Sequence, residues 1–185
     1  MRLVTGLLLG LLIIPVVGFL YFRLGMAPVA AKDALMPFER WAAHTALHTR
    51  IDRDMPRTVP LQATAENLVA GARVYAEHCV FCHGFKGQEQ TSAAKGMFPK
   101  PPHLFHGKGV TDDTPGETYW KTAHGIRLSG MPGFEQSLSE QQLWQVSLLL
   151  ANADKLPPEV EPIVTGQKQP YDAQSSMPKE AKNSR

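Results

Sequence analysis

A long uncharged apolar run opens the sequence, from Leu3 to Phe22. As a helix, its 20 residues would extend about 30 Å, which matches the hydrocarbon core of a bilayer. Arg2 and Arg23 flank the run, and it has no polar face of the kind that a surface helix of a soluble protein shows. The pattern therefore predicts a transmembrane anchor over residues 1–23.

The same run has a second interpretation as a signal peptide, because small residues from Val29 to Ala31 precede Lys32. The run is longer than the roughly 7–15-residue core of a signal peptide, and the small residues lie well past its end, so a retained anchor is favoured. Both interpretations send the remaining chain out of the cytoplasm. We expect a membrane-anchored protein whose soluble domain lies on the periplasmic side.

Residues 24–62 are predicted to be a linker that contains one short amphipathic helix. Trp41 and His48 fall on one face of this helix, and Pro56 prevents it from continuing. His44 and His48 are also spaced as the ligands of a metal site on a helix can be. No third ligand stands at a matching position, so a partly solvated face packed on the neighbouring domain is the favoured interpretation.

Caps and amphipathic periodicity then predict three helices in the part of the chain that follows the linker. Thr64 and Ser139 are suitable N-caps, and the middle helix has a proline and an acidic residue in its first turn. These signals place helices over residues 64–79, 115–124 and 139–154. The proline-rich segment 157–185 lacks such a pattern, so we expect it to be a disordered tail.

These helices alone give the domain a thin core. Residues 84–115 are rich in Gly and Pro, and their apolar residues are scattered singly. Three short helices bury little apolar surface for a domain of roughly 90 residues, and so long a loop needs something to hold it. A large apolar cofactor wrapped by the loop would supply the missing core.

The two cysteines of the chain give this cofactor a chemical identity. Cys79, Cys82 and His83 form a C-x-x-C-H motif, the attachment signature of a c-type haem. Each thiol can add to one vinyl group of the porphyrin, and the imidazole that follows can bind the iron. Two cysteines cannot form a disulfide framework, and the net charge of +2 excludes a strongly cationic nucleic-acid binder.

Two other interpretations of the motif are weaker. A thioredoxin-like C-x-x-C needs a βαβ pattern, which this sequence does not show. A zinc site could add His78 to the motif, but four ligands so close in sequence would crowd a tetrahedron, and no second ligand pair follows.

Residues 63–156 resemble the small single-haem c-type cytochromes, both in the C-x-x-C-H motif and in the sequence Gly130-Met131-Pro132 before the last helix. The resemblance implies the small cytochrome c fold, in which a few helices and no sheet wrap around one covalent haem c. It also implies that the first and last helices cross at a small residue. The residues at this crossing would be Gly71, Tyr75, Trp144 and Leu148.

The candidates for the sixth iron ligand are Met131, Met97, His103, His106 and His124. In the cytochromes that this domain resembles, a methionine just before the last helix takes this role, which favours Met131. Met97 follows His83 closely, whereas Met131 leaves room for the chain to return across the other face of the haem. We therefore expect His83 and Met131 to ligate the iron.

The resemblance also implies supporting roles for other residues. It suggests that the carbonyl of Pro102 accepts the Nδ1–H of His83 and that Leu104 packs on the haem. A rigid proline turn without any haem role is the alternative interpretation of this segment. From their place just before Met131, the donors to the haem propionates would be Trp120, Tyr119 and Arg127, and a solvated side chain is the alternative interpretation of Arg127.

With both axial positions filled, no small-molecule substrate reaches the iron, and one-electron transfer is the remaining chemistry. We expect an electron carrier rather than an enzyme, working in a membrane-associated respiratory chain. Its redox partners would be a donor dehydrogenase or quinol-oxidising complex and an acceptor oxidase or reductase. The lysines of the wrapping loop either steer an acidic partner or keep the loop soluble; they are Lys86, Lys95, Lys100 and Lys108.

The leading alternative is a permanently bound haem c subunit of a larger membrane oxidoreductase, with residues 24–62 and 155–185 as docking arms. A gas-binding haem protein is a third possibility, and it would not need Met131. A zinc-binding module is the fourth, and a pyridine-haemochrome assay would exclude it.

Overall fold

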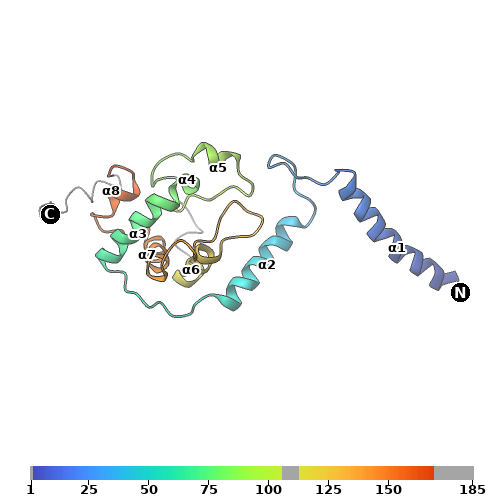
Figure 1. Ribbon diagram of the computed structural model, residues 1–185, viewed down its shortest axis with the longest axis horizontal. Helices are drawn as coiled ribbons and strands as arrows, with labels where there is room; N and C mark the ends of the chain where they lie inside the picture. Colours follow the sequence, from blue (N-terminus) through green and yellow to red (C-terminus); the bar gives the residue numbers. More distant parts are fainter. Residues whose placement is uncertain (1, 106–112, 169–185) are drawn as a thin grey trace, which may run out of the picture. The chain divides into compact units, whose positions relative to one another are not determined.

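Helices make up all the regular secondary structure of the described residues (Figure 1). The computed structural model describes residues 2–105 and 113–168. Its elements in chain order are α1 (Arg2–Arg23), α2 (Glu39–Asp54), α3 (Ala65–His78), α4 (Val80–His83), α5 (Ser92–Gly96), α6 (Pro115–His124), α7 (Glu140–Ala151) and α8 (Glu161–Val164). No strand occurs within the two described ranges, in agreement with the all-α prediction.

The chain divides into two compact units, Met1–Ala43 and His44–Arg185. In the first unit, α1 forms over the predicted apolar run, and Gly25 just beyond its end has a φ of 70°. Across the described part of the chain, no helix is long and apolar enough to cross a membrane. The transmembrane anchor predicted for residues 1–23 therefore has no support in the structure.

The helix predicted inside the linker is α2, but the aromatic residues Phe38 and Trp41 near its start are exposed. It begins after Phe38, which has a φ of 64° and lies outside the helix. Trp41 is 68% exposed, whereas Ile51 near the other end is only 1% exposed. Burial of α2 is therefore confined to its C-terminal part.

The segment after α2 packs against α6 and is part of the second unit. The hydroxyl of Thr114, the N-cap of α6, donates a weak hydrogen bond to the sulfur of Met55 at 3.9 Å. A Cβ on Gly116 would overlap the carbonyl oxygen of Pro56, so glycine is required for this close approach. Residues 24–62 are therefore a free linker only in part.

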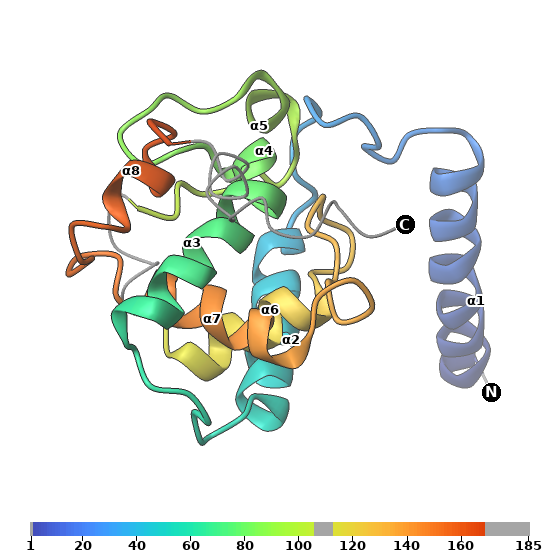
Figure 2. The same ribbon diagram turned by 60° about the vertical axis from the view of Figure 1, so that its left-hand side comes forward.

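α3 and α7 form the centre of the second unit, and both begin at the predicted caps. The hydroxyl of Thr64 accepts a hydrogen bond from the amide of Asn67, and Ser139 forms a capping box with Gln142. α7 packs against both α3 and α6 (Figure 2). The buried apolar side chains of α3 and α7 include Leu68, Val74, Leu143, Val146 and Leu149.

The predicted crossing of α3 and α7 is present, and Gly71 lies at it. A Cβ on Gly71 would overlap the carbonyl oxygen of Gln145, so the two backbones touch at Gly71. Tyr75 packs edge-to-face on Phe105, with ring centroids 4.9 Å apart. Contact at Gln145 turns the neighbouring Trp144 toward α6, because successive helical side chains point about 100° apart.

The beginning of the predicted tail is ordered. Val160 and Val164 are fully buried, Ile163 is 6% exposed, and α8 packs against α3. These three residues follow the i, i+3, i+4 pattern of a short amphipathic helix. The prediction of disorder is therefore wrong for residues 157–168, while the rest of the predicted tail lies outside the described residues.

Candidate cofactor site

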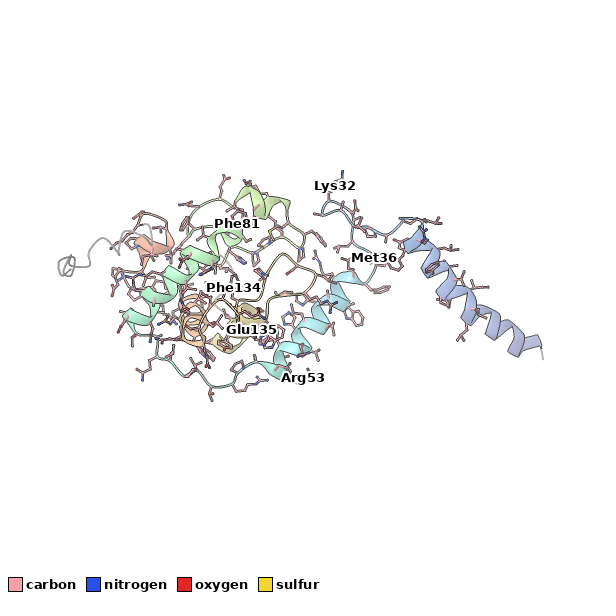
Figure 3. All side chains as sticks on the ribbon, in the orientation of Figure 1. Lys32, Met36, Arg53, Phe81, Phe134 and Glu135 are labelled. Carbon is pink, nitrogen blue, oxygen red and sulfur yellow. The ribbon has the colours of Figure 1, made fainter. Side chains whose placement is uncertain are left out.

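The C-x-x-C-H motif lies at the junction of α3 and α4. Cys79 ends α3, and its carbonyl oxygen accepts a hydrogen bond from the amide of His83 at 2.9 Å. Gly84 then ends α4 with a φ of 76°, a conformation that glycine adopts without strain. Phe81, between the two cysteines, is 74% exposed (Figure 3). One helical turn and its cap therefore hold His83 together with the free thiols of Cys79 and Cys82.

The imidazole of His83 is oriented by the backbone of the loop that follows. Its Nδ1 lies 2.8 Å from the carbonyl oxygen of Pro102, which is the contact that the resemblance implies. When Nδ1 donates this hydrogen bond, Nε2 is the nitrogen left to bind a metal. Burial lowers the pKa of His83 more than the bond to Pro102 raises it, so the neutral, metal-binding form of the ring is favoured.

The turn is also held from α3 by a contact that no sequence pattern indicates. The hydroxyl of the fully buried Tyr75 donates to the carbonyl oxygen of Gly84 at 2.6 Å. Burial raises the pKa of Tyr75 well above its ordinary value, so the hydroxyl keeps its proton and remains a donor. The residue after His83 is therefore tied directly to the helix that precedes the motif.

The segment after Pro102 lies beside the turn that carries His83. The ring of His103 is 3.3 Å from where a Cβ on Gly84 would stand, and its proximity lowers the pKa of His83 further. The ring of His103 therefore lies against the backbone that follows His83. Leu104 is half-buried against the hydrophobic core, and its contact with a haem remains a prediction.

The loop that carries Met131 is closed by its own hydrogen bonds. The amide of Ile126 donates to the carbonyl of Met131 at 3.1 Å, and the amide of Met131 donates to the hydroxyl of Ser129 at 3.1 Å. At the base of the loop, a Cβ on Gly125 would stand 2.5 Å from the amide nitrogen of Gly133, so the backbones are in contact there. The half-buried side chain of Met131 therefore projects from a well-defined backbone.

The structure brings Met97, the other candidate thioether, to the same loop. A Cβ on Gly130 would overlap the methyl group of Met97, so Met97 packs against Gly130, the residue before Met131. His124 bonds through Nδ1 to the carbonyl of its own helix at Trp120, at 3.0 Å. The last candidate, His106, lies outside the described residues. Ligation of the iron by Met131 remains a prediction.

The three predicted propionate donors have different surroundings. Trp120 is 8% exposed and stacks on His124, with ring centroids 4.9 Å apart. Tyr119 stacks instead on Trp144 of α7, at 4.3 Å. Arg127 is exposed and forms no ion pair with any residue that the structure describes. Their donation to propionates stays a prediction.

His44 and His48 do form a pair on α2, with ring centroids 4.4 Å apart. Within residues 2–105 and 113–168, no three His, Cys, Asp or Glu side chains gather in a way that could hold a metal ion. His48 is half-buried and His44 is exposed. The pair therefore lacks the third ligand that a metal site on this helix would need.

Two lysines of the wrapping loop are paired within the second unit. Lys86 forms an ion pair with Glu161, and Lys95 forms one with Glu89 at 3.2 Å. Such pairing lowers the net positive charge that these side chains present to a partner. Lys108 lies outside the described residues.

The thiols of Cys79 and Cys82 and the oriented imidazole of His83 fit a covalently attached haem. Similarity to known proteins supports the same cofactor. Residues 66–148, which include the motif and Met131, match the family described as "Cytochrome C oxidase, cbb3-type, subunit III". The curated protein "Thiosulfate dehydrogenase" of Thiomonas intermedia (strain K12) is 26% identical over 141 residues, which cover 71% of this chain and 42% of that protein. These matches support a c-type cytochrome. This chain spans less than half of that relative, and no solved structure gives a significant match.

A cytochrome c domain implies a covalent haem c, and the state of its cysteines can be tested without the haem. Burial, with a smaller contribution from Cys82, raises the pKa of Cys79 from 9.0 to about 12. Since the thiolate is the nucleophile, this shift lowers the reactive fraction of Cys79 near neutral pH. We expect Cys79 in the haem-free protein to be alkylated more slowly near neutral pH than in the unfolded peptide, as measured by peptide mass spectrometry. A rate equal to that of the unfolded peptide at neutral pH would contradict the geometry.

Proposed function

We propose that the cytochrome carries single electrons through one haem c, attached by Cys79 and Cys82 and ligated by His83 and Met131. The observation that carries this proposal is the hydrogen bond between His83 and Pro102 beside two free thiols. A haem bound there supplies one-electron Fe(III)/Fe(II) chemistry. The matches to an oxidase-subunit family and to a dehydrogenase add support for electron transfer.

In this proposal the chain's own residues fix the ligands and exclude other chemistry. The carbonyl of Pro102 sets the plane of the His83 ring, and the hydrogen-bonded loop at Ser129 sets the backbone of Met131. If His83 and Met131 both hold the iron, no coordination site would be left for a small molecule, and the protein would act as a carrier and not as an enzyme in its own right. The one C-x-x-C-H motif in the sequence limits it to one electron at a time.

The proposal places the carrier in a membrane-associated respiratory chain, on the periplasmic side. The uncharged run from Leu3 to Phe22 supports export, because a signal peptide and a retained segment both lead out of the cytoplasm. The donor would be a dehydrogenase or a quinol-oxidising complex, and the acceptor would be an oxidase or a reductase.

A permanently bound haem subunit of a larger oxidoreductase is the second candidate, because the matched family is described as an oxidase subunit. This candidate needs docking arms outside the haem domain. Ile51 and α8 are instead buried in their own unit, which leaves less of the chain for such arms and favours the carrier.

Purification of the full chain in mild detergent from the cells that make it separates the two candidates. A lone protein with one haem supports the carrier, whereas a stable complex of several subunits supports the alternative. Adding thiosulfate to the purified protein then tests the activity for which its relative is named. Reduction of the haem by thiosulfate alone would make the protein an enzyme and overturn the carrier proposal.

Replacing Met131 with alanine tests the proposed ligand set. We expect Met131→Ala to lose the absorption band of the methionine–iron bond and to bind carbon monoxide. Its reduction potential should fall by on the order of 100 mV, because the axial ligand strongly tunes a haem potential. Absorption spectroscopy and redox titration of the holoprotein measure these changes.

The matched control is Met97→Ala, since Met97 packs beside the same loop and was the other candidate thioether. We expect this variant to keep the methionine–iron band. If Met97→Ala loses the band and Met131→Ala keeps it, the assignment of the two methionines is reversed.

A further inference from the structure

The docked segment of residues 157–168 lies beyond the part of the chain that matches a known family, which ends at residue 148. Its two valines, Val160 and Val164, are fully buried in the main core. α8 packs against α3, the helix that ends at Cys79. The segment is therefore built into the cytochrome domain at the helix that leads to the haem motif.

The same segment contacts the residues that follow His83. α8 lies beside the loop that joins α4 to α5 (Figures 1 and 2). The amide of Lys86 donates to the carbonyl oxygen of Val164 at 2.8 Å, and its ammonium pairs with Glu161. The side-chain amide of Gln88 donates to the carbonyl oxygen of Thr165 at 2.9 Å. Backbone and side chains thus tie the loop to the C-terminal segment at two positions.

A close apolar contact adds to these hydrogen bonds. The ring of Phe85 lies 3.1 Å from where a Cβ on Gly166 would stand, so the ring packs on bare backbone. Gly166 has a φ of 76°, which also favours glycine at this point. Because Tyr75 already holds the carbonyl of Gly84, residues 84–88 are held by α3 at one end and by the C-terminal segment along the rest.

On the basis of the proposed function, we propose that residues 157–168 form a clamp that positions His83, with Phe85 and Glu161 as positioning residues. One peptide bond separates His83 from residues 84–88, so their position affects the backbone of His83, while the bond to Pro102 orients its ring. The orientation and hydrogen bonding of an axial imidazole help to set the reduction potential of its iron. The clamp therefore links the potential of the carrier to a segment outside the matched family span.

The test compares Phe85→Ala and Glu161→Gln with two controls in the full-length holoprotein. We expect both clamp variants to shift the midpoint potential and the low-spin EPR g-values, and to speed hydrogen exchange at the Lys86 amide. Glu161→Asp, which keeps the charge, should restore values close to those of the wild type.

The controls separate positioning from stability and from charge. Ile51→Ala removes a buried side chain outside the core cluster that contains α8, so it should lower the melting temperature and leave the potential unchanged. Glu159→Gln removes the same charge from the same segment at an exposed position without an ion pair among the described residues. It should leave the g-values unchanged.

Unchanged g-values in both clamp variants would overturn the clamp, and so would a potential shift equal to that of Glu159→Gln. If Phe85→Ala fails to fold, Glu161→Gln still decides, because the side chain of Glu161 is 41% exposed. A wild-type protein without haem would overturn the proposed function and the clamp together. A wild-type protein with a His/Met spectrum and unshifted variants would overturn the clamp alone.

Discussion

Replacing both cysteines with serine, as Cys79→Ser with Cys82→Ser, should abolish covalent attachment of the haem completely. The two thiols are the only cysteine side chains in the sequence, so no other residue can form the thioether links. Haem staining of a denaturing gel and the pyridine-haemochrome spectrum measure the loss. Because a bound haem would fill part of the core, the double variant should also melt at a lower temperature than the wild type.

The matched control for this variant is Phe81→Ala, within the same motif. Phe81 is 74% exposed between the two cysteines, so its removal should leave attachment intact. Haem that stays bound to the double serine variant on a denaturing gel would refute thioether attachment. A wild-type protein that binds zinc and no haem would support the zinc module instead.

Local signals were enough to predict the central helices. α6 has the predicted bounds, and α3 and α7 begin after the predicted caps Thr64 and Ser139. These elements carry their own start signals, because a side-chain oxygen next to an apolar stripe fixes where a helix begins. The C-x-x-C-H motif is equally local, so its place at the end of α3 could be predicted as well.

Contacts between distant segments could not be predicted in the same way. Tyr75 and Gly84 meet through the fold, and α8 has only a few apolar residues among prolines that suggest disorder. The contact between His83 and Pro102 spans 19 residues, and it was expected from the resemblance rather than from any periodic pattern. Tertiary packing decides such contacts, and in a short element it outweighs composition.

The crossing of α3 and α7 could be predicted from the sequence only in part. A glycine in the apolar face of α3 indicates a close approach, and Gly71 does touch the backbone of α7. The backbone that it meets is at Gln145, while the neighbouring Trp144 stacks on Tyr119 of α6. The sequence therefore indicates the position of the contact on one helix but not its partner on the other.

Gly71→Ala should be among the most destabilising single substitutions in the protein. The added Cβ would overlap the carbonyl oxygen of Gln145 and stand 2.6 Å from its carbonyl carbon. Both atoms belong to the backbone of α7, so no side-chain rotation can relieve the clash, and the helices have to separate. We expect a loss of on the order of 3 kcal/mol in the free energy of unfolding, measured by urea denaturation of the holoprotein.

The matched control is Gly96→Ala in α5, where an added Cβ meets nothing within 4 Å. This variant should be neutral or slightly more stable, because alanine favours a helix more than glycine does. The contrast matters for the cofactor site, since α3 ends at Cys79 and any separation from α7 moves the motif. Gly71→Ala should therefore lower haem content as well as stability, whereas equal stability in both variants would show that the helices do not touch at Gly71.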